Sequence, residues 1–179
     1  MINDLLHRGL VVVFIGFNPS PTSSATGFPY AHRSNRFYRL LHSSGLTPIL
    51  HPPSDNPHML AWYGYGFTNI VARTTKRADE IRPEEWRAGR LILKDKLSLY
   101  KPIIACFVGK GVYQKYAERS KVDFGFQECT VLPDMMEFVA PGTSGLVRMD
   151  FAVQTSIYEE LAKKVEELRK KGYRPPRQN

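Results

Sequence analysis

The apolar run from Leu10 to Ile15 is the feature that most limits how this chain can fold. A run of this kind, without a polar residue, is typical of a strand buried on both faces of a parallel sheet. Gly16 allows the backbone to turn sharply after the run, and Pro19 prevents the strand from continuing. Asn18 is therefore expected on a stiff turn at the carboxyl end of a strand, which is where open α/β sheets bind their ligands. The competing interpretation is that the Asn-Pro pair only forms a turn.

Strand-like and helix-like segments alternate through the rest of the chain. This alternation predicts the α/β fold class, as a three-layer α/β/α sandwich with a central, mainly parallel sheet. Further strands are expected at residues 103–108 and 136–139, because both segments are dominated by apolar side chains. Helices are expected at residues 35–41, 84–99, 112–119 and 151–171, and a hairpin near residues 124–127.

The charge balance indicates a polyanionic partner. The 179 residues include 25 Lys and Arg against 17 Asp and Glu, which gives a net charge of +8 and a pI near 9.6. Nucleic acid is favoured over a membrane, because no apolar stretch approaches the ~18 residues of a membrane span. Basic runs at residues 73–77 and 169–171 would strengthen binding at low salt.

The length suits one domain, over residues 1–172, followed by a basic tail at residues 173–179 that is expected to be disordered. The N-terminal residues lack the charged and apolar regions of a signal peptide, so the protein is expected to be intracellular.

No metal or cofactor is predicted. Cys106 and Cys129 form no CxxC pair and are expected to be reduced, structural thiols, and the five histidines show no metal-ligand spacing. The segment Gly109-Lys110-Gly111 lacks the GxxxxGK[ST] pattern of a nucleotide-phosphate loop. Asp134 and Glu137 are expected to face solvent, because the first precedes a predicted strand and the second alternates with apolar neighbours inside it.

Loops at the ends of the predicted strands supply candidate site residues. A long loop over residues 20–34 is expected to form one wall of a site. Because parallel strands bring their carboxyl ends to one edge, the loops led by Asn18, Lys110 and Leu146 should meet there. An enzyme that acts on a base of duplex DNA must extrude the base, stack it on an aromatic ring and fill the gap with a wedge side chain. A positioned amide, an aromatic-bearing loop and an exposed leucine suit these tasks.

A series of motifs resembles one known family, the mismatch-specific uracil/thymine DNA glycosylases of the uracil-DNA glycosylase superfamily. The resemblance covers nearly the whole chain, and its motifs occur in the same order. They are GFNPS at residues 16–20, TGFPYAH at 26–32, NRFY at 35–38, GYGFTNIVARTT at 64–75 and DFGFQ at 123–127.

The resemblance implies a monofunctional DNA glycosylase of base excision repair. Such an enzyme hydrolyses the N-glycosidic bond of uracil, and of thymine or related pyrimidines, opposite guanine in double-stranded DNA, and leaves an abasic site. It would act as a monomer without a cofactor and without lyase activity, in the bacterial cytoplasm or the eukaryotic nucleus. Physical chemistry agrees, because uracil leaves as a stabilised anion that preorganised donors can hold.

Two alternatives stay open. The first is a module of the same fold that binds mismatched or abasic DNA with little turnover, since Ser20 and Ala140 depart from the motifs of bacterial members. The second is a nucleotide-binding α/β protein that ignores duplex DNA. Turnover of excess substrate separates the first alternative from an enzyme, and binding of free nucleotide identifies the second.

The resemblance also assigns the residues of a base pocket. Asn18 would position the water that attacks the anomeric carbon, and Tyr30 would stack on the extruded pyrimidine. Backbone N–H groups near Phe17 and Tyr30 would bind the carbonyls of the base, and Ser23 lies where relatives differ in their tolerance of a 5-substituent. The remaining positions are Asn35, Asn69 and Thr75. A structural interpretation competes for them, in which Asn35 is only a helix cap and Thr75 is only a turn residue.

The loop after the last predicted strand resembles the second motif of the family. Bacterial members have Asn-Pro-Ser-Gly-Leu-Ser-Arg, whereas this chain has Ala140 in place of the Asn and a longer loop. Leu146 is the candidate wedge, and Arg148 would contact a phosphate or the opposing guanine. Lys110 matches a family lysine and would contact the DNA backbone, or else only helps to begin a helix. The other DNA-binding positions are Thr143, Ser144 and Gly145.

Overall fold

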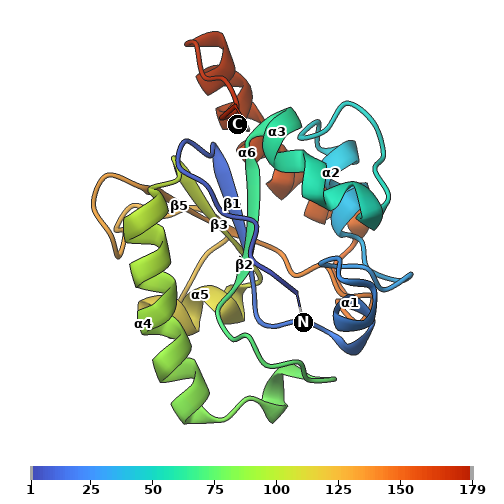
Figure 1. The fold of residues 1–179 in the computed structure, drawn as a ribbon, viewed down its shortest axis with the longest axis vertical. Coiled ribbons are helices and arrows are strands. Elements are labelled where there is room, and N and C mark those ends of the chain that lie inside the picture. The colour runs from blue at the N-terminus through green and yellow to red at the C-terminus, as the bar shows by residue number, and fades with distance from the viewer. Residues whose placement is uncertain (1, 178–179) are drawn as a thin grey trace.

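The centre of the molecule is one mainly parallel β-sheet (Figure 1). The computed structural model describes residues 2–177, and within them the strands form a five-stranded sheet in the order β2-β1-β3-β5-β4. Neighbouring strands run parallel, except that β4 is antiparallel to β5. The predicted fold class is therefore confirmed. The strands are β1 (Val12–Gly16), β2 (Tyr65–Asn69), β3 (Ile104–Val108), β4 (Gly125–Phe126) and β5 (Met136–Ala140).

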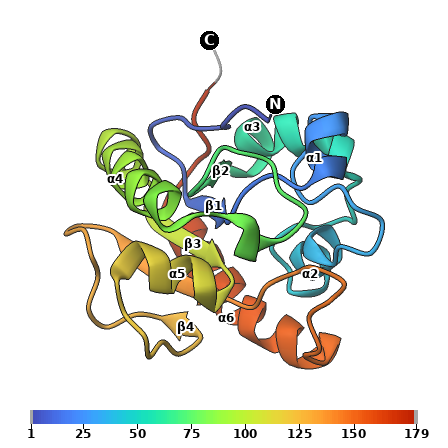
Figure 2. The same ribbon diagram turned by 90° about the horizontal axis from the view of Figure 1, so that it is seen from below.

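Helices cover both faces of the sheet, which completes the three layers (Figure 2). One face carries α2 (Phe37–Ser43), α3 (Met59–Tyr63) and α6 (Phe151–Lys170). The opposite face carries α4 (Pro83–Tyr100) and α5 (Lys110–Ala117). The remaining helical segments are α1 (Pro21–Thr26) and two 3₁₀ turns, η1 (Pro53–His58) and η2 (Ala78–Glu80).

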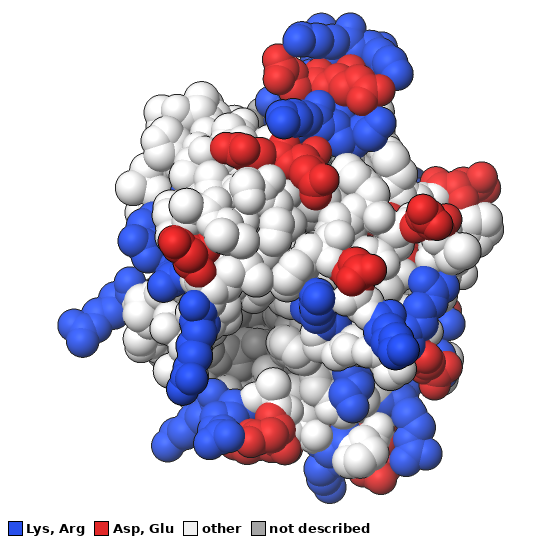
Figure 3. Space-filling view, turned by 180° about the vertical axis from the view of Figure 1, so that it is seen from behind, with Lys and Arg blue, Asp and Glu red and all other residues white. Residues whose placement is uncertain are grey.

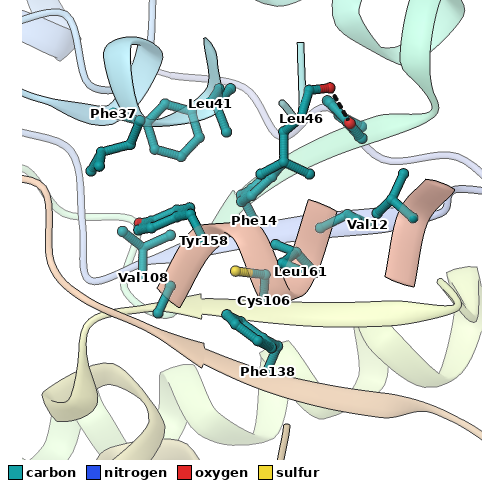
Figure 4. Close-up of a cluster of buried hydrophobic side chains, with 14 of the residues drawn as sticks. Val12, Phe14, Phe37, Leu41, Leu46, Cys106, Val108, Phe138, Tyr158 and Leu161 are labelled. Carbon is teal, nitrogen blue, oxygen red and sulfur yellow. Dashed lines mark hydrogen bonds between the residues drawn. The ribbon is translucent and has the colours of Figure 1, made fainter. Parts of the chain in front are cut away.

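The parallel strands are almost entirely buried, as the apolar sequences of β1, β3 and β5 predict, whereas Phe126 of the edge strand β4 is exposed. In β1, Val12 and Phe14 pack with side chains of α2 and α6, whereas Val13 and Ile15 pack with side chains of α4 and α5. Figure 4 shows the first of these clusters, with Phe14 and its strand partner Cys106 in its middle. Cys106 is a buried free thiol, as predicted. Since both faces are covered, the strand ends are the places where polar side chains can form a site.

The segment 20–34, which was predicted to be a loop, contains the short helix α1. Ser20 caps this helix, its Oγ accepting from the backbone N–H of Ser23 over 3.2 Å, and Pro21 occupies the first turn. Gly27 ends the helix at a φ of 81°, in the left-handed region that favours glycine. The loop prediction was wrong because six residues without a large apolar side chain carry no helical periodicity.

The other predicted helices are present with small shifts at their ends. Helix α2 begins at Phe37, two residues after Asn35, and α5 begins at Lys110 rather than at Val112. The start of α5 is possible because Gly109 has a φ of 116°, which residues with a side chain rarely adopt.

Glu137 was predicted to face solvent, and this is wrong. Its side chain is fully buried in β5. The carboxylate accepts a hydrogen bond from the Tyr113 hydroxyl over 2.7 Å and another from the backbone N–H of Val131 over 3.0 Å. In a sheet covered on both faces, a residue that alternates with apolar neighbours points into the opposite layer and not into water. Asp134 is exposed, as predicted.

The segment predicted to be a disordered tail, residues 173–179, begins with a fixed residue. The Tyr173 hydroxyl donates to the carbonyl of Gly9 over 2.7 Å, and its ring lies so close to Gly64 that no larger residue would fit there. This contact lies one residue beyond the predicted domain boundary at residue 172, and residues 178–179 lie outside the described part. No helix within residues 2–177 is long and apolar enough to cross a membrane.

Candidate active site

A pocket of about 220 Å³ opens at the carboxyl ends of β1, β2 and β3, the edge at which parallel strands place ligand sites. Pockets for drug-sized ligands range over roughly 300–1,000 Å³, so this one suits a single small planar group. The structure brings together at this pocket all the residues expected to form a base pocket. They are Phe17, Asn18, Ser23, Tyr30, Asn35, Asn69 and Thr75.

The side chain of Asn18 is held by two hydrogen bonds. Its Nδ2 donates to the backbone carbonyl of Arg73 over 2.6 Å and to Thr75 Oγ1 over 2.8 Å. A carbonyl only accepts, so the nitrogen end of the amide must face Arg73. Both amide protons are thereby used, and Oδ1 makes no hydrogen bond to any residue that the structure describes. Asn18 is therefore fixed as an acceptor at the pocket.

Thr75 is both a turn residue and a pocket residue. Its hydroxyl donates to the carbonyl of Arg77 over 2.7 Å, which leaves a lone pair to accept from Asn18. The side chain is buried beneath the turn and still lines the pocket. Thr75 is therefore a turn residue that also lines the pocket.

Tyr30 forms an aromatic wall. Its ring stacks on Phe37, with centroids 4.0 Å apart and planes 19° from parallel. Its φ of 56° is a strained backbone conformation for a residue with a large side chain, and such strain is concentrated at ligand sites. The Tyr38 hydroxyl supports this conformation by donating to the carbonyl of Pro29 over 2.8 Å. Burial raises the pKa of the Tyr30 hydroxyl above its usual range, so the wall is uncharged.

Gly16 leaves room for two pocket side chains to lie against the end of β1. A Cβ at this position would lie 2.6 Å from Asn69 Oδ1 and 3.1 Å from the Tyr30 hydroxyl. A larger residue would displace one of them, so glycine is required here by close approach and not by a turn. Phe17 extends the wall, and its ring packs edge-on against Trp86 with centroids 5.5 Å apart.

Asn35 lies just before α2, whose N-cap residue is Arg36 and not Asn35 as the cap interpretation expects. Its Oδ1 accepts from the backbone N–H of Phe37 over 2.9 Å in a local turn. This use of the oxygen leaves Nδ2 as a donor beside the pocket that Asn35 lines. Ser23 is buried in the wall, where its Oγ accepts from Ser20 Oγ over 3.1 Å and from the backbone N–H of Ala31 over 3.4 Å.

The loop after β5 carries most of the predicted DNA-binding residues. Leu146 is 89% exposed, and Arg148 is exposed beside it. Gly145 lies against Ser34, because a Cβ at Gly145 would come within 2.6 Å of Ser34 Oγ. Gly145, Leu146 and Arg148 do not line the pocket, whereas two other loop residues do: Thr143 and Ser144.

Hydrogen bonds from two neighbouring elements fix this loop. Gln154, which is fully buried on α6, donates from Nε2 to the carbonyl of Gly142 over 2.8 Å. Its Oε1 accepts from a terminal nitrogen of Arg36 over 2.8 Å, and the same nitrogen donates to the carbonyl of Met149 over 2.9 Å. No motif of the sequence indicated Gln154, and the NRFY motif contains Arg36 without indicating this pairing, because Arg36 and Gln154 are 118 positions apart in the sequence.

Lys110 does not line the pocket. It is the first residue of α5, and its Nζ lies 4.3 Å from the ring centroid of Phe124. This position fits the helix-entry interpretation, and a DNA contact would have to be made from the rim.

Several pocket residues were missed by sequence reasoning. Ile2 reaches the pocket because Leu5 pairs with Phe67 in an antiparallel bridge, and nothing in the sequence indicates that pairing. The others are Gly16, Pro19, Ser20, Pro29, Lys76, Arg77, Ala78, Val108 and Gly142. Four of these could have been found, because Gly16, Pro19 and Ser20 lie in the GFNPS motif and Pro29 lies in TGFPYAH.

Basic side chains lie around the site. Figure 3 shows a hollowed face with Lys and Arg side chains beside the hollow and several Asp and Glu side chains among them. Lys76 and Arg77 line the pocket itself. Within residues 2–177 no group of three or more His, Cys, Asp and Glu side chains is suited to hold a metal ion. The positive charges of Lys76 and Arg77, the second of which pairs with Asp79 over 2.7 Å, favour an anion at the pocket.

The fold and the site define an α/β protein that offers a small planar group an aromatic wall, fixed amides and a basic rim. The model of the uracil DNA glycosylase superfamily matches residues 5–167, which include all five strands. The chain therefore belongs to the uracil DNA glycosylase superfamily. Members of this superfamily are DNA N-glycosylases, hydrolases that act on DNA in base excision repair.

Proposed function

We propose that this protein is a monofunctional glycosylase that removes uracil, and also thymine or related pyrimidines, opposite guanine in double-stranded DNA. The observation that carries the proposal is the Asn18 amide, whose nitrogen is held by Arg73 and Thr75 while its oxygen stays free beside an aromatic pocket. Superfamily membership supports the reaction class, and the sequence motifs support the choice of base.

The pocket would bind the base after it leaves the duplex. Tyr30 would stack on the pyrimidine, because its ring is held flat against Phe37. Asn35 Nδ2 and the amide of Asn69 would bind the polar edge of the ring, together with backbone N–H groups near Phe17. The base departs as an anion, and donors fixed in advance stabilise that charge as it develops.

Asn18 would orient the nucleophile. Its Oδ1 accepts a hydrogen bond from a water molecule and directs the water oxygen at the anomeric carbon of the deoxyribose. The new C–O bond forms as the C–N bond breaks, the electron pair of that bond goes to the base, and the proton of the water is released to solvent or to the departing base. The products are the free base and an abasic site.

The loop after β5 would act on the DNA helix. Leu146, exposed at its tip, would fill the space left by the extruded base, and Arg148 would contact a phosphate or the opposing guanine. Lys110 would bind the DNA backbone from the rim. Backbone and hydroxyl contacts would come from Thr143, Ser144 and Gly145.

A second candidate function is a binding module with little turnover. It is favoured by Ala140, which is fully buried in β5 and has no polar side chain at the position where bacterial members carry Asn. Excess substrate distinguishes the two, because an enzyme releases base repeatedly and a binding module does not.

The test uses labelled duplexes that contain G·U, G·T or A·U pairs, incubated with the wild type or with Asn18→Ala and then treated with alkali. We expect breaks only after alkali, strongest for G·U, and a fall of about 100-fold or more in Asn18→Ala with duplex binding retained. Breaks without alkali, or a borohydride-trapped adduct, would contradict the monofunctional reaction. Lys76 lines the pocket but is solvent-exposed, whereas lysine nucleophiles act from desolvated sites. Salt-sensitive binding without any breaks would support the binding module.

A further inference from the structure

Arg73 is the first residue of the basic run 73–77, yet its guanidinium makes hydrogen bonds to other residues of the protein. Its Nε donates to Glu85 Oε1 over 2.6 Å, and a terminal nitrogen donates to Glu85 Oε2 over 2.9 Å. The same terminal nitrogen also donates to the carbonyl of Glu80 over 2.9 Å. A two-point pair of this geometry fixes orientation as well as charge. The prediction that residues 73–77 add charge for DNA binding therefore does not describe Arg73.

The backbone of Arg73 performs a second task. Its carbonyl accepts one of the two hydrogen bonds that hold Asn18 Nδ2, over 2.6 Å. A single residue thus joins the side chain of Asn18, after β1, to Glu85, on the first turn of α4.

Glu85 is itself anchored. Its carboxylate accepts from the backbone N–H of Arg82 over 2.9 Å, within the capping box that begins α4. The side chain is only 17% exposed, against 47% for Arg73. The hydrogen bonds and charge of Arg73, with the backbone N–H of Arg82, lower the pKa of Glu85 from its usual 4.5 to about 2. It is an anion at any pH at which DNA is stable.

We propose that Arg73 and Glu85 are positioning residues for Asn18. The ion pair holds the 73–75 turn at the distance at which the Arg73 carbonyl fixes Asn18 Nδ2, and so keeps Oδ1 toward the pocket. If the turn moves, the amide is free to rotate and to present its nitrogen to the water, which it cannot orient as an acceptor would. The inference rests on the proposed function, because it takes Asn18 as the residue that positions water.

The first variant is Glu85→Gln. Glutamine still accepts from the backbone N–H of Arg82 and keeps the capping box, but it loses the charge that holds Arg73. We expect the single-turnover rate on a G·U duplex to fall by about 10- to 100-fold, as small misplacements of reacting groups do. Affinity for an uncleavable duplex should stay unchanged, because the proposal gives Arg73 and Glu85 the task of holding Asn18 and not of binding DNA.

The matched control is Glu84→Gln. It removes the same charge one position earlier in the same helical turn, where Glu84 is 71% exposed and its partner Arg87 lies 3.6 Å away. We expect its rate to equal that of the wild type. Arg73→Lys is the second variant, because lysine keeps the charge but not the two-point geometry, and it should lose rate as Glu85→Gln does.

A structural readout separates this inference from the proposed function. The side-chain amide protons of Asn18, assigned by their loss in Asn18→Ala, should exchange slowly with solvent in the wild type and in Glu84→Gln, and faster in Glu85→Gln. Unchanged exchange together with an unchanged rate in Glu85→Gln would overturn the positioning role. If the wild type releases no base from any duplex, the proposed function fails, and the exchange of the Asn18 amide alone still decides whether the pair holds that side chain.

Discussion

Asn18 and Thr75 are 57 positions apart in the sequence, and Asn18 Nδ2 donates to Thr75 Oγ1 over 2.8 Å. The Thr75 hydroxyl is itself held in place, because it donates to the carbonyl of Arg77 over 2.7 Å. The orientation of the Asn18 amide is thus set by the turn that follows β2, the strand that pairs with β1 at the same edge of the sheet. This relationship gives the hydroxyl of Thr75 a function separate from any contact with the base.

The first prediction concerns that hydroxyl. Thr75→Val keeps the shape and removes both hydrogen bonds, so the rate of base release should fall between about 5- and 30-fold, since each bond contributes about 1 kcal/mol. Thr75→Ser should retain most of the rate. The measurement is single-turnover release from G·U and G·T duplexes. Should Thr75→Val instead change the ratio of uracil to thymine release at an unchanged G·U rate, Thr75 acts on the 5-substituent and not on Asn18.

The second prediction concerns the loop tip. Leu146 is 89% exposed, so Leu146→Ala should leave the free energy of unfolding within about 0.5 kcal/mol of the wild type. On duplex DNA the rate should fall about 10-fold or more, because a leucine inserted between bases contributes roughly 1.5–3 kcal/mol. On single-stranded uracil DNA, which has no gap to fill, the rate should not change.

The control for this variant is Leu91→Ala, which shortens an exposed leucine on α4 away from the site. It should leave both rates unchanged. Equal losses on duplex and single-stranded DNA in Leu146→Ala would contradict a wedge.

The strands β1, β3 and β5 could be predicted from the sequence for physical reasons, whereas β2, with the sequence YGFTN, has no continuous apolar run and was not predicted as a strand. Continuous apolar runs such as Leu10–Ile15 permit few structures other than buried parallel strands, and parallel strands bring Gly16, Asn69 and Val108 to one edge. The site positions themselves came from motif resemblance. Their geometry, such as the two hydrogen bonds of the Asn18 side chain, depends on contacts between residues far apart in the sequence, which no local sequence pattern indicates.

The errors have equally specific causes. Glu137 alternates with apolar residues, and alternation alone does not reveal that a loop closes over the side chain. Helix α1 is capped by Ser20 and has no apolar face, so it lacks the periodicity on which helix prediction depends. The pairing of Arg73 with Glu85 depends on where α4 packs, which a run of basic residues does not indicate.

The third prediction concerns the support of the loop after β5. Gln154→Leu fills the same space but leaves the carbonyl of Gly142 without its side-chain partner and leaves the Arg36 nitrogen with only the carbonyl of Met149. The free energy of unfolding should fall by about 1–3 kcal/mol, as measured by urea denaturation. Hydrogen exchange should increase in residues 142–149 more than in the strands.

A matched control is Gln114→Leu, which removes a hydrogen bond to the carbonyl of Ser120 at a more exposed position. Its effect on unfolding should remain within about 0.5 kcal/mol. Equal destabilisation by the two variants would show that Gln154 has no special function at the loop.

The fourth prediction concerns pH and the Arg73–Glu85 pair. The pKa of Glu85 is lowered from 4.5 to about 2 in the folded protein, chiefly by the hydrogen bond from Arg73. A carboxyl whose pKa is lower in the folded than in the unfolded state stabilises the fold fully above the unfolded value, and this contribution is lost as the pH falls through the folded one. The stability due to the pair should therefore be constant above about pH 5 and decline between pH 4.5 and about 2.

The measurement is the difference in Tm between the wild type and Glu85→Gln from pH 7 to pH 2. Other carboxyls with lowered pKa, such as Glu167 beside Lys171 and Lys164, are common to both proteins and cancel in the difference. The wild type should be the more stable protein above pH 5, and the two values of Tm should converge as the pH approaches 2. A difference that persists to pH 2 would mean that Glu85→Gln destabilises the fold by a route other than the loss of charge, because glutamine keeps the capping bond to Arg82, and the loss of rate in Glu85→Gln would then need another cause.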